Sequence, residues 1–361
     1  MIKVLVVDDS PLLRRLLDGV LRSAGGFEVA LARNGEEALA QLHAFRPDVV
    51  TLDIEMPGMG GLACLDRIMI ERPCPVVMVS AQAAAGAAAT LEAMALGAVD
   101  FIAKPGGAIS LEMDTFAPVL LEKIRTAAGA KLRRSHRLAE RIRAQLEGRL
   151  AGRGARLDPP ARLLPPSSAT ESCLLIGAST GGPPALEAVL SRLPADLPCA
   201  VLVAQHMPAA FTGPLAQRLA ALCPLEVCEV VEPTLLAAGR IHIAHGGADA
   251  VVSRRPGGLI IRPVPAAAAL HWHPSVDRLV DSALEYFEPS RLIGVLLTGM
   301  GNDGAAAMTR LRAAGGRTLA EAEESAVVWG MPGALVQAGG AEIVAPLDEI
   351  GDRIRSLVEA L

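Results

Sequence analysis

Residues 173–183 read Cys-Leu-Leu-Ile-Gly-Ala-Ser-Thr-Gly-Gly-Pro, a short apolar run followed by a glycine-rich turn. The apolar run predicts a buried strand, and residues 184–190, Pro-Ala-Leu-Glu-Ala-Val-Leu, predict a helix. Ser179 therefore stands on a sharp strand-to-helix turn, where glycine permits tight backbone geometry and helical N–H groups can face a developing negative charge. Residues 177–181 also fit G-x-S-x-G, the spacing of a nucleophile elbow. A glycine-rich connector and a phosphate-binding loop remain alternatives at this point.

The composition sets the class of protein. A chain of 361 residues is long enough for two domains, and 51% hydrophobic against 20% charged residues permits a large core. A net charge of -5 and 2% aromatic residues argue against nucleic-acid binding. The six cysteines form no C-x-x-C pair and are predicted to be buried hydrophobes. The first residues are too short an apolar run for a signal peptide, and no uncharged run of eighteen apolar residues occurs, so we expect a cytoplasmic protein without membrane insertion.

The N-terminal third alternates apolar segments with helical patterns. This alternation predicts a parallel sheet with helices on both faces, as in a doubly wound α/β fold. The predicted strands are residues 4–7, 48–52, 75–79 and 99–103, and the predicted helices are residues 12–21, 36–42, 62–70 and 87–96.

Five polar residues follow these strands: Asp8, Asp9, Asp53, Ser80 and Lys104. Ligands of such sheets bind beyond the carboxyl ends of the strands, so we expect these side chains to meet. Three carboxylates in one place repel each other, and a hard cation such as Mg²⁺ relieves that repulsion. Asp53 can then act as a carboxylate nucleophile toward a phosphoryl group, whose oxygens Ser80 and Lys104 could hold.

This segment resembles the receiver domain of two-component response regulators over about residues 1–125. The matching pieces are Val-Val-Asp-Asp-Ser at 6–10, Leu-Asp-Ile-Glu-Met-Pro-Gly-Met-Gly-Gly at 52–61, Met-Val-Ser-Ala at 78–81 and Asp-Phe-Ile-Ala-Lys-Pro at 100–105. The resemblance implies a flavodoxin-like fold phosphorylated on Asp53 by a histidine kinase. It assigns Mg²⁺ to Asp8, Asp9 and Asp53, sensing of the phosphoryl group to Ser80 and Lys104, and the rotating aromatic switch to Phe101.

Residues 126–170 are predicted to be a basic linker. Residues 131–156 hold nine Lys or Arg against two Glu, and residues 131–150 have helical spacing. Glycines, prolines and serines between 152 and 168 break regular structure. Composition favours a solvated linker, and docking onto an acidic partner is the alternative.

A nucleophilic serine needs a base and a group that orients the base. The predicted strand at 200–204 is followed by His206, and the one at 292–297 is followed by a glycine-rich loop that carries Asp303. Three strand ends thus supply Ser, His and Asp to one edge of a sheet, as acyl transfer requires. The order Ser, His, Asp differs from the Ser, Asp, His order of α/β-hydrolases. Among the other histidines, His273 is kept as a candidate substrate-side group.

Residues 171–361 resemble the catalytic domain of the chemotaxis protein-glutamate methylesterases, and a receiver upstream is that family's layout. The matching pieces are residues 176–183, Gln-His-Met-Pro at 205–208, Phe-Thr at 211–212, Pro-Ser-Val-Asp at 274–277, Leu-Leu-Thr-Gly-Met-Gly-Asn-Asp-Gly-Ala-Ala at 296–306 and Gly-Met-Pro at 330–332. The resemblance implies a Rossmann-like domain without a cofactor, in which Thr180 and Met300 help to shape the oxyanion site.

The activity implied by this resemblance is hydrolysis of glutamate methyl esters on methyl-accepting chemotaxis receptors, with release of methanol and deamidation of some glutamines. Residues 244–249, residues 270–273 and Gly333 depart from the family pattern, so substrate choice stays open. Three alternatives compete: an esterase for another protein carboxyl ester, a response regulator whose second domain only binds, and a dinucleotide-dependent enzyme. The acidic balance of residues 157–361 disfavours DNA binding, and the absence of G-x-G-x-x-G spacing disfavours a dinucleotide.

Overall fold

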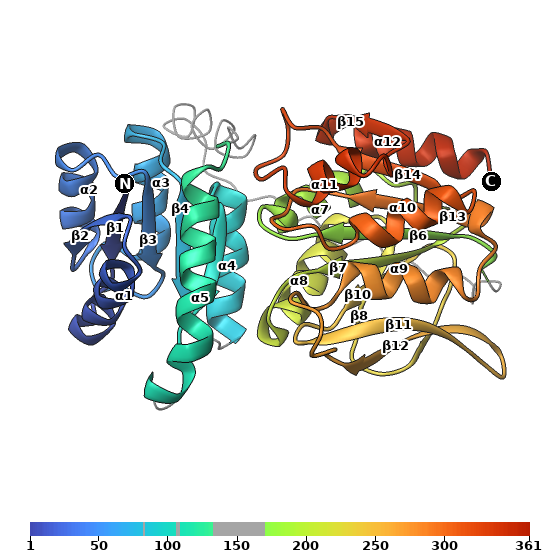
Figure 1. Cartoon of the computed structure of the whole chain (residues 1–361), viewed down its shortest axis with the longest axis horizontal. Coiled ribbons are helices and arrows are strands. Elements are labelled where there is room, and N and C mark those ends of the chain that lie inside the picture. Colours follow the sequence, from blue (N-terminus) through green and yellow to red (C-terminus); the bar gives the residue numbers. More distant parts are fainter. Residues whose placement is uncertain (82–83, 106–108, 133–169) are drawn as a thin grey trace, which may run out of the picture. The chain divides into compact units, whose positions relative to one another are not determined.

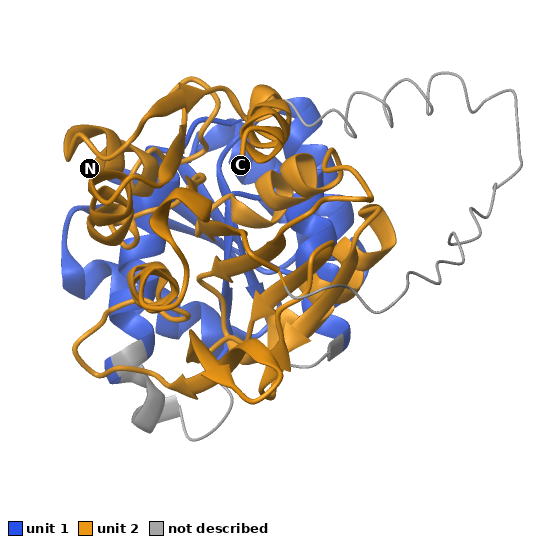
Figure 2. Cartoon of the chain, turned by 90° about the vertical axis from the view of Figure 1, so that its right-hand side faces the viewer, with its two compact units in different colours: residues 1–153 blue, residues 154–361 orange. Residues whose placement is uncertain are grey.

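The computed structural model describes the chain except for residues 82–83, 106–108 and 133–169 (Figure 1). The chain divides into two compact units, residues 1–153 and residues 154–361 (Figure 2). The helix predicted over residues 131–150 lies outside the described residues from position 133 onward.

The first unit is built on a parallel sheet of five strands. Its order, β2-β1-β3-β4-β5, is the flavodoxin-like order of doubly wound proteins, so the predicted fold is confirmed. β3 and β4 are buried along their whole length because helices cover both faces. The strands are β1 (Ile2–Val7), β2 (Phe27–Ala32), β3 (Val49–Asp53), β4 (Val76–Ser80) and β5 (Asp100–Ala103).

Five helices cover this sheet within the described part of the unit. α1 contacts α5, while α2 contacts α3 and α3 contacts α4. Side-chain caps fix two of the helix starts, since Ser10 accepts a hydrogen bond from Leu13 N–H and Asn34 accepts one from Glu37 N–H. The boundary expected at residue 125 falls inside the last helix, which continues for three residues. The helices are α1 (Pro11–Ala24), α2 (Gly35–Ala44), α3 (Gly61–Glu71), α4 (Ala84–Leu96) and α5 (Ile109–Ala128).

Sequence analysis missed strand β2. It lies at the edge of the sheet, and only its first and last residues, Phe27 and Ala32, are buried. An edge strand with one covered face lacks the continuous apolar run that marked the central strands.

The second unit is built on a parallel sheet of seven strands in the order β15-β14-β13-β6-β7-β10-β8. From β6 the chain first adds strands on one side and then crosses to β13 on the other, which confirms the predicted doubly wound architecture. The strands are β6 (Cys173–Ala178), β7 (Ala200–Gln205), β8 (Glu226–Val230), β10 (Arg240–Ala244), β13 (Leu292–Leu296), β14 (Arg317–Glu321) and β15 (Ile343–Ala345).

Helices and a small sheet complete this unit. α12 contacts α7, which contacts α8, while α10 contacts both α9 and α11. The antiparallel sheet β11-β12-β9 was not predicted, and its strand β11 packs against α9. The helices are α7 (Gly182–Leu190), α8 (Ala209–Leu222), α9 (Val276–Leu284), α10 (Ala305–Ala313), α11 (Met331–Gln337) and α12 (Leu347–Glu359), and the remaining strands are β9 (Thr234–Leu235), β11 (Ala248–Arg255) and β12 (Gly258–Pro265).

The core of the second unit joins both sheets. Val276 and Leu279 of α9 pack into one buried cluster with Leu296 of β13 and with Val252 of β11. None of the described helices combines the length and the hydropathy that a membrane span requires.

Candidate catalytic and phosphorylation sites

Three neighbouring strands of the second sheet carry the predicted triad. β6 lies between β13 and β7, and Ser179, Asp303 and His206 follow these strands at their carboxyl ends. The backbone ties the loops together, because Ser179 N–H donates to Thr298 O over 3.0 Å and His206 N–H donates to Ala178 O over 3.0 Å. The predicted meeting of three strand ends is therefore present in the structure.

The imidazole of His206 has one nitrogen engaged and one available. Nε2 lies 2.8 Å from Asp303 Oδ2, in a pair whose side chains are 7% and 5% exposed. Nδ1 is buried and has no hydrogen-bond partner among the described residues. The carboxylate therefore favours the tautomer with the proton on Nε2, in which Nδ1 is the nitrogen that can accept a proton.

Asp303 lies on the loop between β13 and α10, and its carboxylate accepts four hydrogen bonds, two of them from the first N–H groups of α9. Besides His206, the donors are Ser275 Oγ (3.0 Å), Val276 N–H (2.7 Å) and Asp277 N–H (3.0 Å). Burial by itself raises the pKa of Asp303. The hydrogen bond and charge of His206 and the two backbone N–H donors outweigh burial and lower that pKa below its usual value. The group is thus a carboxylate at neutral pH, and its orientation is fixed.

The turn around Ser179 leaves no room for side chains on its glycines. Gly181 has a φ of 76°, and a Cβ on Gly182 would lie 2.0 Å from Gln205 Oε1. A Cβ on Gly299 would lie 2.8 Å from Ser179 Cβ. The serine therefore contacts the loop that carries Asp303.

Thr180 and Met300, the predicted supporting residues, flank Ser179 on the two loops and are 2% and 8% exposed. Thr298 joins these loops, since its Oγ1 donates to Thr180 O over 2.9 Å and accepts from Val328 N–H over 3.0 Å. The buried Glu321 accepts from Thr298 N–H over 2.8 Å. Glu321 had no signal in the sequence, because it is a single acid at the end of β14.

Asp249 is a second residue that sequence analysis passed over, except as part of a segment that departs from the family pattern. Its buried carboxylate accepts from His273 Nδ1 (2.8 Å), Ser275 N–H (2.8 Å), Ala267 N–H (3.1 Å) and Arg278 (2.8 Å). Burial raises its pKa, but these donors, His273 first, lower it below the usual value. Residues 244–249 and 270–273, the two segments that differ from the family pattern, are thus joined by the hydrogen bond between His273 and Asp249.

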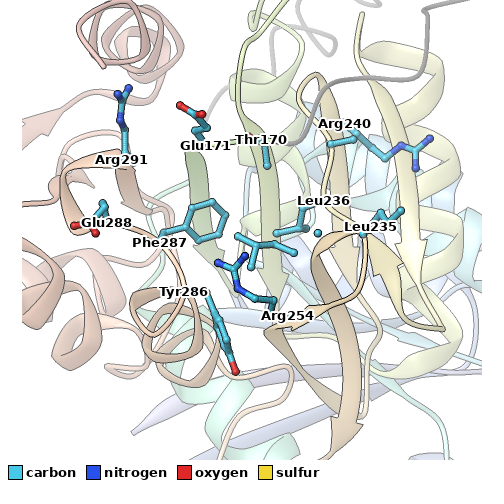
Figure 3. A pocket seen from close by; sticks show the side chains of 14 residues that line it. Thr170, Glu171, Leu235, Leu236, Arg240, Arg254, Tyr286, Phe287, Glu288 and Arg291 are labelled. Atoms are coloured by element: carbon cyan, nitrogen blue, oxygen red, sulfur yellow. The ribbon is translucent and has the colours of Figure 1, made fainter.

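A cavity of about 580 Å³ lies at the other edge of the sheet (Figure 3). Its lining includes Thr170 and Glu171 before β6, Arg240 at the start of β10 and Arg291 before β13. These are amino ends of parallel strands, whereas the triad lies at carboxyl ends. This cavity is therefore not the candidate catalytic site, which is identified from the positions of Ser179, His206 and Asp303.

The predicted phosphorylation site assembles at the carboxyl edge of the first sheet. Lys104 Nζ lies 2.7 Å from Asp53 Oδ2 and 3.7 Å from Asp8 Oδ2. Burial and then the neighbouring Asp53 raise the pKa of Asp8 to about 6. Burial also raises the pKa of Asp53, against the opposing effect of Lys104. The site therefore holds more negative charge than its own lysine neutralises.

The donor set fits a magnesium ion. Asp8, Asp9 and Asp53 each offer a carboxylate oxygen, and these oxygens lie within 4.8 Å of one another. Asp8 Oδ2 is buried and accepts no hydrogen bond from any described residue. Mg²⁺ prefers oxygen ligands, and a cluster of carboxylate oxygens suits it.

Ser80 and Phe101 contact residues outside the cluster of carboxylates in this structure. Ser80 Oγ donates to Gly86 O over 3.1 Å. Phe101 is 4% exposed, and its ring lies 5.4 Å from Lys123 Nζ, which also pairs with Asp100 over 2.6 Å. Ser80 must leave the Gly86 carbonyl before it can donate to a phosphoryl oxygen.

Comparisons with known proteins identify the two domains. Residues 174–354 match the family described as CheB methylesterase, and residues 4–113 match the response regulator receiver domain. Protein-glutamate methylesterase/protein-glutamine glutaminase 2 of Rhodopseudomonas palustris (strain BisB18) is 55% identical over 97% of this chain and 96% of that protein. The corresponding enzyme 3 of Rhodospirillum rubrum is 52% identical over 99% of this chain and 96% of that protein. The crystal structure of the Thermotoga maritima CheB methylesterase catalytic domain matches with a TM-score of 0.50 and 33% identity, over 53% of this chain and all of that one.

Proposed function

The chain belongs to the CheB family of protein-glutamate methylesterases/protein-glutamine glutaminases with a receiver domain, and from this premise we propose that Ser179, His206 and Asp303 carry its hydrolytic chemistry. The substrates are glutamate methyl esters, and some glutamines, of methyl-accepting chemotaxis receptors. Family membership favours this activity over the binding-only and dinucleotide alternatives. The observation that carries the proposal is the imidazole of His206, which is held by Asp303 through Nε2 and has no partner at Nδ1 among the described residues, on a loop whose backbone is bonded to Ala178, the residue before Ser179.

The reaction follows from this arrangement. Ser179 Oγ attacks the ester carbonyl while Nδ1 of His206 takes the hydroxyl proton, and the imidazolium is stabilised by Asp303. When the tetrahedral intermediate collapses, His206 returns the proton to the methoxy oxygen and methanol leaves. Water then attacks the acyl-enzyme with His206 again as base, releasing the glutamate carboxylate and restoring Ser179. A glutamine side chain follows the same path with ammonia as the leaving group.

Backbone N–H groups are the natural donors to the oxyanion in this path. The first residues of α7 are not those donors, because Pro183 and Pro184 have no N–H and Gly182 N–H donates to Ser179 O over 2.8 Å. We therefore assign this role to backbone N–H groups of the loops around Ser179. Thr180 and Met300 are proposed to shape this oxyanion site from the two sides of the serine. No cofactor enters the hydrolytic steps.

The receiver is proposed to control this activity through Asp53. We propose that residues 1–125 form the receiver, residues 126–170 the linker and residues 171–361 the catalytic domain, so that the last three residues of α5 extend into the linker. Asp53 is proposed to accept a phosphoryl group from a histidine kinase in the cytoplasm. Asp8, Asp9 and Asp53 would hold the Mg²⁺, which supplies positive charge to the phosphoryl oxygens. Ser80, Lys104 and Phe101 would then respond to the new charge.

Methanol release from methylated receptor tests the nucleophile. We expect Ser179→Ala to abolish release while the free energy of unfolding changes by less than about 1 kcal/mol, because the variant loses one hydroxyl. Ser191→Ala, at the end of α7, is the matched control and should turn over normally. Wild-type turnover by Ser179→Ala would rule out the proposed mechanism.

Labelling with a radioactive small phosphodonor tests the receiver. Asp53→Asn should take up no label, and wild-type labelling should require Mg²⁺ because the buried carboxylates otherwise repel the phosphoryl group. Asp18→Asn removes a carboxylate that pairs with Arg22 on α1 and should label normally. Label retained by Asp53→Asn would place the acceptor elsewhere.

A further inference from the structure

Trp272 lies against the imidazole of the triad. The two rings are parallel within 4°, and their centroids are 6.0 Å apart, which is an offset stack. Trp272 belongs to the segment 270–273 that departs from the family pattern, and it is half-buried. A large aromatic side chain therefore packs on one face of His206, and it comes from a loop whose sequence differs from the family pattern.

Several contacts hold the indole in this place. A Cβ on Gly301 would lie 2.4 Å from Trp272 Cζ2, so the glycine opens the space that the ring fills. His271 meets the indole edge-on with centroids 4.9 Å apart, and the next residue, His273, is bound to Asp249 over 2.8 Å. The indole Nε1–H is buried and has no acceptor among the described residues, so packing and the anchored loop, not a hydrogen bond of its own, hold the ring.

The contact with Trp272 matters because Nδ1 of His206 has no hydrogen-bond partner in the described part of the chain that would fix the ring. With only Nε2 bonded, the imidazole keeps some freedom to turn about its Cβ–Cγ bond, which would change the direction in which Nδ1 points. A parallel indole on one face blocks that rotation. It also excludes water from the ion pair that forms when His206 takes the proton, and the π face of an indole attracts such a cation.

We propose that Trp272 is a positioning residue for His206, which keeps Nδ1 aimed at Ser179 during hydrolysis. The inference rests on the proposed function, because it assumes that Ser179 is the nucleophile and His206 its base. It differs from a role in receptor binding, which would act on the affinity for the receptor and not on the reactivity of the serine.

Two readouts on the full-length protein separate these roles. The first is kcat and KM for methanol release from methylated receptor. The second is the rate at which a small fluorophosphonate labels Ser179, followed by mass spectrometry. In that labelling a bond forms from Ser179 Oγ to phosphorus, the phosphorus–fluorine bond breaks, fluoride leaves and His206 takes the serine proton. Labelling needs the serine and its base but no receptor.

We expect Trp272→Leu to lower kcat and the labelling rate together by about three- to tenfold, the range of one aromatic pair, and to leave KM within about twofold. Trp272→Phe keeps a ring on His206 and should retain at least about half of both rates. Trp272→Met is a second ring-free variant, should the leucine lower the folded fraction. Tyr286→Leu removes an aromatic ring from the cavity at the opposite edge and should change neither rate.

Wild-type labelling of Trp272→Leu would overturn the inference, as would an unchanged kcat with a raised KM, which would make Trp272 a receptor contact. Loss of both rates in Trp272→Phe equal to that in Trp272→Leu would also overturn it. Ser179→Ala distinguishes a failure of the proposed nucleophile from a failure of the role inferred for Trp272. Full labelling of that variant would remove the proposed nucleophile itself, whereas a failure confined to Trp272 would leave the triad in place.

Discussion

At the scale of single residues, two buried carboxylates organise the catalytic edge. Asp303 orients His206, and Asp249 fixes the loop that leads into α9. Ser275 joins them, because its N–H donates to Asp249 and its hydroxyl donates to Asp303. Each carboxylate offsets its desolvation with four donors, as a buried charge requires. Apart from His206, the groups that hold Asp303 take no part in the proposed chemistry.

Asp303→Asn should show how far this orientation matters. An amide has one oxygen to accept hydrogen bonds where the carboxylate uses two, so at least one of the donors from Ser275, Val276, Asp277 and His206 would meet an N–H₂ group. Such a change favours the wrong imidazole tautomer, and we expect kcat to fall by roughly 10³- to 10⁴-fold. Steady-state methanol release measures this loss.

Asp281→Asn, on α9, is the matched control. Asp281 pairs with Arg310 at the surface, where both side chains are about half exposed, so its loss should leave kcat unchanged and cost less than about 1 kcal/mol of stability. A mild effect of Asp303→Asn, within tenfold of wild type, would mean that another group orients His206.

At the scale of elements, neighbouring strands place side chains that are distant in sequence. β10 pairs with β8, and this register sets His242 beside Cys228, with Nδ1 and Sγ 3.5 Å apart. His242 is fully buried. Burial first, and then repulsion by Arg240, lower its pKa to about 3. The strand pair therefore holds a histidine that is neutral throughout the physiological range.

This pKa predicts an acid-sensitive stability. The folded-state pKa of His242 lies below the unfolded value of 6.5, so its contribution is fully present above pH 6.5 and is lost as the pH falls toward 3. Between pH 7 and pH 4 the loss amounts to roughly 3 kcal/mol. His242→Leu removes the titration, so its free energy of unfolding relative to wild type should rise by about that amount over the same interval.

Urea unfolding followed by tryptophan fluorescence measures this difference. Both tryptophans, Trp272 and Trp329, belong to the second unit, so the signal reports that unit alone. Other titrating groups cancel in the difference between variant and wild type where they do not contact the site. Parallel pH profiles for the two proteins would show that His242 is not the group responsible.

At the scale of the whole molecule, the two sites lie in separate units. The triad lies within residues 154–361, and the carboxylate cluster around Asp53 lies within residues 1–153. Each unit has its own sheet and core. A phosphoryl group carries about 1.5 to 2 negative charges and replaces the single charge of the Asp53 carboxylate, so the net gain is roughly one charge. Interfaces between domains are modest enough for such a change to open them.

We therefore expect removal of residues 1–150 to raise the basal rate of methanol release and to abolish any response to phosphodonor. Full-length protein should be activated by phosphodonor, and Asp53→Asn should not. Initial rates on methylated receptor, with and without phosphodonor, compare the three proteins. Equal basal rates for the full-length and truncated chains would exclude inhibition by the receiver and leave recruitment to the receptor as the route of activation.

The sequence by itself determined the strands whose residues are apolar without interruption and the polar residues that follow them. Such runs are local signals, and in a parallel sheet they also fix which edge carries Asp53, Ser179 and His206. Strand β2 and the sheet β11-β12-β9 escaped because they are partly exposed, so their apolar residues are interrupted. Local pattern thus carried the architecture and the choice of residues that we propose as the reacting groups.

Only the tertiary structure decided how those groups are held. The sequence does not state which nitrogen of His206 faces Asp303, and it gives no reason to join Asp249 to His273 or Trp272 to His206. These contacts join residues from 24 to 97 positions apart. They arise when strands and loops pack together, and no periodicity or local propensity encodes them. The candidate reacting residues could therefore be proposed from the sequence, while the orientation of their side chains depended on long-range packing.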